Sequence, residues 1–116
     1  MADGGPRMTI PTQLVLRALL EDPTRELYGV EVGAAAGLPS GTVHPILARL
    51  EGLRWLESRW EEIDTRVAGR PARRYYRLTR EGAECADEAL QAIKRARKTA
   101  TRAWRIPAPG TSGAGA

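Results

Sequence analysis

The stretch "GTVHPILARLEGLRWL", residues 41–56, joins a start of small and polar residues to an apolar pattern of helical period. Its apolar side chains recur at spacings of three and four residues, which places them on one face of a helix. They are Val43, Ile46, Leu47, Leu50 and Leu53. Ser40 is a favourable N-cap just before this helix, and Pro45 is tolerated because few backbone hydrogen bonds are lost near a helix start. The opposite face is left to contact a partner.

Two shorter helices are predicted before this one. In the first, Thr9 or Thr12 is the cap, a proline lies in the first turn, and Asp22 with Pro23 ends the helix. The second lies in "LYGVEVGAAAGLP", residues 27–39, and ends at Gly37, a natural left-handed C-cap. The link "GLPS" to the next helix is the short turn that sets two helices at a steep angle.

After Gly52 the pattern changes to that of strands. The segments "WLESRWEEI", residues 55–63, and "RRYYRL", residues 73–78, predict a two-stranded hairpin with a long tip between them. Thr79 then caps a final helix rich in Ala, Glu, Lys and Arg. This order predicts a mainly α fold with a small β-hairpin: a winged helix-turn-helix followed by a C-terminal dimerisation helix.

The expected domain organisation follows from these elements. The predicted parts are a disordered N-terminal tail (1–8), a winged helix-turn-helix DNA-binding domain (9–78), a C-terminal dimerisation helix (79–106) and a low-complexity, disordered tail (107–116).

Basic charge is unevenly distributed. The net charge is only +4, but residues 65–80 hold six arginines and no carboxylate, whereas "ESRWEEID" before them holds four acids and one arginine. A solvated surface is the plain explanation for such a run, but its place beside a recognition helix favours double-stranded DNA as the partner. The expected DNA-binding residues are Ser40, Gly41, Thr42, His44, Pro45 and Arg49 on the helix and Arg70, Arg73 and Arg74 on the wing.

The final helix carries an apolar stripe that a small N-terminal domain has too little surface to cover. A second copy of the chain would cover it and set two recognition helices on a near-palindromic site. The alternative is that the stripe folds back onto the first helix of the same chain. The expected dimerisation residues are Ala86, Leu90, Ile93, Ala96, Ala100 and Trp104.

Several function classes are not expected. With one cysteine and one histidine, the chain offers no internal disulfide, zinc cluster or catalytic constellation, so no enzyme activity, metal or cofactor is predicted. No apolar run has membrane-spanning length, which predicts a cytoplasmic protein with no membrane partner. Cys85 is expected to be inert rather than a redox switch. Trp55, Trp60 and Trp104 are expected to pack in the core or an interface rather than to sandwich a planar effector.

Three segments resemble successive motifs of the PadR family of transcriptional regulators: "LYGVEV", "GTVHPILARLEGLRWLE" and "GRPARRYYRLTREG". The resemblance implies a homodimeric, cytoplasmic repressor, which a small-molecule effector or stress signal often releases from DNA. The short C-terminal part resembles the smaller subgroup, and His44 stands where the family usually has tyrosine. The function predicted is a sequence-specific DNA-binding regulator acting as a repressor. The alternative is an adaptor or antirepressor that binds a protein through the same surface.

Overall fold

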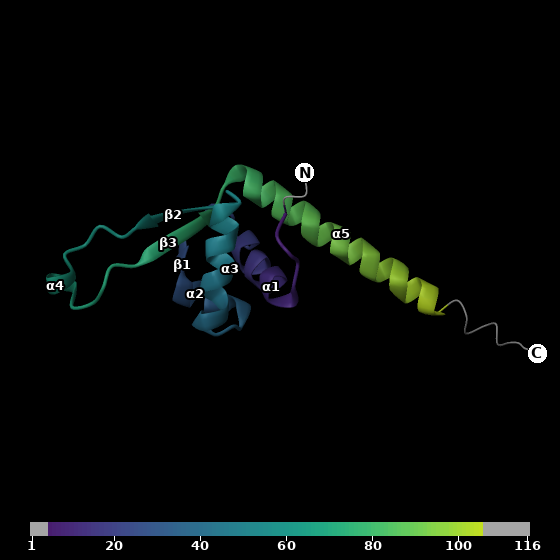
Figure 1. Ribbon diagram of the computed structural model, residues 1–116, viewed down its shortest axis with the longest axis horizontal. Helices are drawn as coiled ribbons and strands as arrows, with labels where there is room; N and C mark the ends of the chain where they lie inside the picture. The colour runs from purple at the N-terminus through teal and green to yellow at the C-terminus, as the bar shows by residue number, and fades with distance from the viewer. Residues whose placement is uncertain (1–4, 106–116) are drawn as a thin grey trace, which may run out of the picture. The chain divides into compact units, whose positions relative to one another are not determined.

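The computed structural model describes residues 5–105, and it confirms the predicted order of major elements (Figure 1). The chain divides after Ala86 into two compact units. The predicted tail at 107–116 and residues 1–4 of the N-terminal tail lie outside the described residues. In chain order the elements are α1 (Ile10–Leu20), β1 (Leu27–Tyr28), α2 (Gly29–Ala36), α3 (Ser40–Gly52), β2 (Leu56–Trp60), α4 (Thr65–Ala68), β3 (Arg74–Leu78) and α5 (Arg80–Arg105).

Local capping explains where α1 and α2 begin and end. Thr9 is the N-cap of α1, and its hydroxyl accepts a hydrogen bond from the Thr12 amide at 3.3 Å. Helix α2 ends at Gly37, whose φ of 73° is left-handed as predicted. The amide of Leu38 then donates to the carbonyl of Gly33 at 2.9 Å, which closes the helix end before the turn into α3.

The start of α3 differs from the prediction by one residue. Pro39, not Ser40, is the N-cap, and its carbonyl accepts from the amides of Thr42 and Val43 at 3.0 and 3.1 Å. Proline suits this place because its fixed φ matches the extended backbone of a cap. Of the predicted apolar stripe, Ile46 is only half-buried. The fully buried members are Val43, Leu47 and Leu50.

The predicted two-stranded hairpin is a three-stranded antiparallel sheet of order β1-β3-β2. Strand β1 was not predicted because it is only two residues long and pairs through Leu27 opposite Tyr76. Because side chains alternate along a strand, one face of the sheet is buried and the other faces outward. The buried face carries Leu27, Leu56, Tyr76 and Leu78.

The core lies between α1, α2 and α3 and the buried face of this sheet. Aliphatic side chains dominate it, in keeping with the scarcity of aromatic residues in the sequence. Its main members are Val15, Leu16, Leu19, Leu27, Val32, Val43, Leu47, Leu50, Leu56, Tyr76, Leu78 and Ala86.

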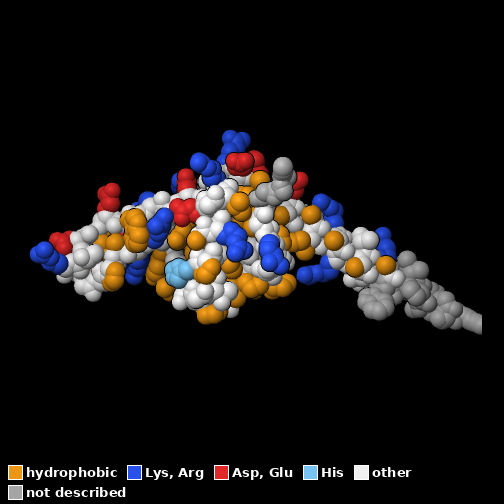
Figure 2. Space-filling model, viewed as in Figure 1, with side chains coloured by type: hydrophobic (Ala, Val, Ile, Leu, Met, Phe, Trp, Pro, Cys, Tyr) orange, Lys and Arg blue, Asp and Glu red, His pale blue; other side chains and the backbone are white. Residues whose placement is uncertain are grey.

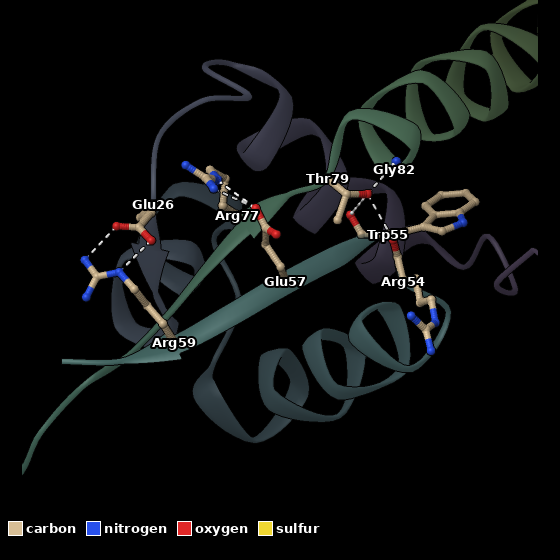
Figure 3. A network of polar contacts seen from close by, with 8 residues as sticks. All are labelled: Glu26, Arg54, Trp55, Glu57, Arg59, Arg77, Thr79 and Gly82. Atoms are coloured by element: carbon tan, nitrogen blue, oxygen red, sulfur yellow. Dashed lines mark hydrogen bonds and ion pairs between the residues drawn. The ribbon is translucent and has the colours of Figure 1, made fainter.

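The beginning of α5 is joined to the backbone between α3 and β2 (Figure 3). The amide of Thr79 donates to the carbonyl of Trp55 at 3.0 Å, and its hydroxyl donates to the carbonyl of Arg54 at 2.9 Å. The same hydroxyl accepts from the amide of Gly82 at 2.8 Å. A Cβ on Gly82 would lie 2.6 Å from the Cα of Trp55, so only glycine fits this approach.

We expect Gly82→Ala to destabilise the protein by about 1 to 3 kcal/mol, because the added methyl group overlaps rigid backbone. Gly52→Ala is the matched control, since Gly52 is also helical but has open space where its Cβ would lie. The control should be neutral or stabilising by roughly 0.5 to 1 kcal/mol. Urea unfolding followed by circular dichroism measures both, and equal stabilities of the two variants would contradict the close approach.

Candidate nucleic-acid interface

The front of α3 presents small and polar side chains to solvent. Gly41 and Ser40 are exposed in its first turn, and Thr42 is half-buried behind them. Arg49 is exposed on the third turn, and within the described part of the chain its side chain forms no ion pair. A guanidinium held this way can donate several hydrogen bonds to a phosphate or to a base edge.

His44 and Pro45 are also exposed on this helix, as predicted. The imidazole of His44 lies against the beginning of α2, where a Cβ on Gly29 would come within 2.7 Å of its Cε1. The ring therefore fills the space beside Gly29 while it stays open to solvent. His44 of α3 thus also contacts α2.

The wing is the β2–β3 hairpin with its tip, residues 56–78. Its tip contains α4, a single turn that was not predicted. The carboxylate of Asp64 caps α4 by accepting from the amides of Arg66 and Val67 at 3.0 and 3.4 Å, and Gly69 ends it with a φ of 71°. The tip is thus an ordered turn with its own caps. Figure 2 shows both basic and acidic side chains over this end of the molecule.

Arg70 is bound within the wing itself. Its guanidinium donates to both carboxylate oxygens of Glu61, at 2.7 and 3.0 Å. Glu61 also accepts from the amide of Arg73 at 3.2 Å. The hydrogen bonds from Arg70, assisted by that amide, lower the pKa of Glu61 to about 2, so this carboxylate stays charged far into the acid range.

The other two predicted wing residues also have partners. The guanidinium of Arg73 lies 4.4 Å from the ring centre of Tyr28, a cation–π distance. Arg74 donates to Glu51 at 3.2 Å and to the hydroxyl of Ser58 at 3.0 Å. Residues 65–80 contain no acid, but the fold brings Glu51 of α3 to Arg74 and Glu61, which directly follows β2, to Arg70.

Arg66 was missed as a candidate. It is exposed on α4, and among the described residues its side chain has no carboxylate partner; Asp64 instead accepts from the backbone amides of Arg66 and Val67. The signal that could have found it is the segment "DTRVAG", residues 64–69, in which an Asx cap is followed five residues later by a glycine C-cap. Val67 beside it has a relative exposure of 85%.

Two further ion pairs lie on the outward face of the sheet (Figure 3). Arg59 on β2 donates to both carboxylate oxygens of Glu26 at 2.8 and 2.7 Å, which ties β2 to the segment before β1. Arg77 donates to Glu57 directly across the β2–β3 pair at 2.7 Å. The side chains of these arginines lie on the outward face, away from the core.

The predicted dimerisation stripe on α5 divides into two parts. Ala86 is fully buried in the core of its own chain, so its assignment to a dimer interface is wrong. Leu90 and Ile93 are half-exposed, and Ala96 and Ala100 are exposed. The side chain of Trp104 lies outside the described residues.

Other residues noted in the sequence have ordinary surroundings. Cys85 is a free, half-buried thiol. Trp55 is half-buried, whereas Trp60 has a relative exposure of 58% and so does not pack in the core of its own chain, which leaves the interface alternative untested. Within the described residues no group of three or more His, Cys, Asp or Glu side chains could hold a metal ion. No helix among these residues is long and apolar enough to cross a membrane.

Comparisons with known proteins agree with this arrangement. A family model described as the transcriptional regulator PadR-like family matches residues 18–88. No curated protein matches the chain.

Solved structures share the fold. A PadR family transcription regulator from Clostridium difficile is 22% identical, with a TM-score of 0.64 over 81% of this chain and 97% of its own. A PadR-like regulator from Bacillus cereus is 20% identical, with a TM-score of 0.62 over 82% of this chain and 91% of its own. Bordetella bronchiseptica BpsR, whose DNA binding is regulated by 6-hydroxynicotinic acid, is 20% identical, with a TM-score of 0.63 over 84% of this chain and 70% of its own.

The lowered pKa of Glu61 predicts an acid-dependent loss of stability at the wing. A carboxylate whose pKa is depressed in the folded state stabilises that state above its unfolded pKa, and this contribution is lost as the pH falls toward the folded pKa. We expect the melting temperature of the wild type to fall between about pH 4.5 and pH 2 by more than that of Glu61→Gln. Thermal melts across this range measure the difference. Parallel pH profiles for the two proteins would rule out the pairing.

Proposed function

Because the chain belongs to the PadR-like family of transcriptional regulators, we propose that it represses transcription in the cytoplasm by binding duplex DNA as a homodimer. Members of this family are transcription regulators, so the chain is not an enzyme. The observation that carries the proposal is the polar, exposed front of α3, where Arg49 has no ion-pair partner among the described residues. We take the operator to be near-palindromic, in keeping with a two-fold dimer.

In this proposal α3 enters the major groove. Ser40 and Gly41 are small enough to let the first turn approach the base edges, and the major groove of about 12 Å admits one helix. Thr42 then lies nearer the bases and Arg49 nearer a phosphate. His44 and Pro45 complete the exposed surface of the helix.

The wing adds contacts that do not depend on sequence. Arg70 and Arg73 are proposed to contact phosphates, and the exposed Arg66 joins them. A phosphate must compete with Glu61 for Arg70, because both ligands bind the same guanidinium. Each phosphate that an arginine neutralises releases condensed counterions, so the affinity should fall steeply with salt.

The remaining part of the α5 stripe is proposed to bind a second chain. Half-exposed Leu90 and Ile93 supply apolar area, and Ala96 and Ala100 let two helices approach closely. Trp104 belongs to the same stripe by its spacing in the sequence. We also propose a small-molecule effector as a partner, whose chemical class is not identified.

The central experiment is footprinting over the DNA upstream of the protein's own gene, followed by salt titration on the protected site. We expect a protected, two-fold symmetric site whose affinity exceeds that for random duplex by a factor on the order of 10³ or more. Equal affinity for both DNAs, or no binding, would instead support an adaptor or antirepressor that binds a protein through this surface.

Arg49→Ala tests the recognition helix. If Arg49 contacts a phosphate, the slope of log affinity against log salt should become shallower by roughly one unit. Arg80→Ala is the matched control, because it removes the same charge from an exposed arginine at the start of α5. The control should keep the wild-type slope, and indistinguishable slopes for the two variants would remove Arg49 from the interface.

Ile93→Asp tests the homodimer. A charge introduced into an apolar helix contact has no partner there and should shift the protein to monomers. Gln91→Asp is the control, because it adds the same charge at an exposed position off the stripe. Sedimentation velocity at micromolar concentration distinguishes the two. A dimer that survives Ile93→Asp would place the interface elsewhere and favour a stripe folded back onto its own chain.

A further inference from the structure

Three polar side chains connect the recognition helix to the wing. Glu51 lies on the last turn of α3, Ser58 in the middle of β2, and Arg74 at the beginning of β3. Arg74 donates to both oxygens of Glu51, at 3.3 and 3.2 Å, and its Nε donates to the hydroxyl of Ser58 at 3.0 Å. Ser58 in turn donates to Glu51. Each of the three residues thus contacts the other two.

The position of this cluster differs from that of the other wing ion pairs. Arg74 and Ser58 lie on the sheet face that also carries the buried Leu56 and Leu78, at the point where the hairpin leaves the core. The pair of Arg70 and Glu61 joins two residues of the wing to each other. Arg74 and Glu51 instead join two different elements, which are separated by 23 residues in the sequence.

Arg74 is also held from a second side. Its guanidinium lies 5.4 Å from the ring centre of the exposed Trp60, its neighbour across the β2–β3 pair. The guanidinium thus donates its Nε to Ser58 and one terminal nitrogen to Glu51, with Trp60 at a cation–π distance, so a phosphate would have to compete with these partners for it.

We propose that Arg74 is a positioning residue, which fixes the wing relative to α3 through Glu51 and Ser58 and does not itself contact DNA. This inference rests on the proposed DNA-binding function. It assigns Arg74 a role different from the phosphate contact expected from the sequence. The wing and α3 must meet one duplex together, so a wing that moves relative to α3 loses affinity even when every DNA-contacting side chain is intact.

The direction in which Glu51→Gln changes the affinity for DNA distinguishes the two possible roles of Arg74. In Glu51→Gln the carboxylate that holds Arg74 is replaced by a neutral group of the same shape. If Arg74 contacted a phosphate, this change would free it and remove a negative charge near DNA, so the affinity would rise. If Arg74 positions the wing, the affinity falls. We expect Glu51→Gln to bind the footprinted site about fivefold to tenfold more weakly.

Glu57→Gln is the matched control. It removes the same charge and also breaks an arginine pair of the hairpin, but Glu57 and its partner Arg77 both lie on the outward face of the sheet and do not join the hairpin to α3. Its affinity should equal that of the wild type. Thermal melts confirm that each variant is folded at the assay temperature.

Arg74→Lys and a double-mutant cycle complete the test. Lysine keeps the positive charge but lacks the planar fork, so we expect Arg74→Lys to lose about as much affinity as Glu51→Gln, and the double variant to lose little more. Tighter binding of Glu51→Gln, wild-type binding of Arg74→Lys, or additive losses would overturn the positioning role.

Hydrogen exchange of the free protein tests the link without DNA. Amides of residues 56–60 and 74–78 should exchange faster in Glu51→Gln and Arg74→Lys than in Glu57→Gln, because the wing is then less firmly held. Unchanged exchange in the first two variants would overturn the proposal. If the wild type binds no duplex but the wing amides exchange faster in Glu51→Gln and Arg74→Lys, the proposed DNA binding is refuted and the positioning role of Arg74 stands.

Discussion

The alternation of side chains along β3 is the constraint on which the rest of the structure depends. This central strand pairs with both β1 and β2, and its register sends Tyr76 and Leu78 into the core while Tyr75 and Arg77 face outward. A slip of one residue would expose the apolar pair and bury Arg77. The same register places Arg74 beside Glu51 of α3. One strand thus determines the core, the outward ion pairs and the link to the recognition helix.

The sequence predicted the elements that are determined by a few neighbouring residues. It did not predict the features that depend on contacts between residues far apart in the chain. The stripe of α3 and the left-handed Gly37 were predictable, because spacing and backbone freedom are properties of a few neighbouring residues. Strand β1 is only two residues long and exists because β3 pairs with it. At the end of α3 the left-handed residue is Arg54, with a φ of 65°, although Gly52 nearby would adopt that conformation at less cost.

The charge pattern of the wing shows the same limit. Residues 65–80 contain no acid, yet Arg70 binds Glu61 and Arg74 binds Glu51. These partners lie 9 and 23 residues away, so only the folded hairpin brings them into contact. Counting basic residues therefore overstated the positive surface available to DNA. Of the candidate arginines, Arg49, Arg66 and Arg73 have no carboxylate partner within the described chain, whereas a phosphate would have to compete with a carboxylate for Arg70.

Helix α5 explains why periodicity alone could not separate core from interface. Its stripe has one spacing throughout, but Gly82 and Ala86 are buried by their own chain, whereas from Asp87 to Ala103 every side chain is exposed or half-exposed. A period of 3.6 residues identifies an apolar face and says nothing of what covers it. The first turns of α5, which carry Gly82 and Ala86, are joined through Thr79 to the backbone that directly follows α3. If a second chain binds farther along α5, as proposed, this junction links the start of that helix to the end of the recognition helix.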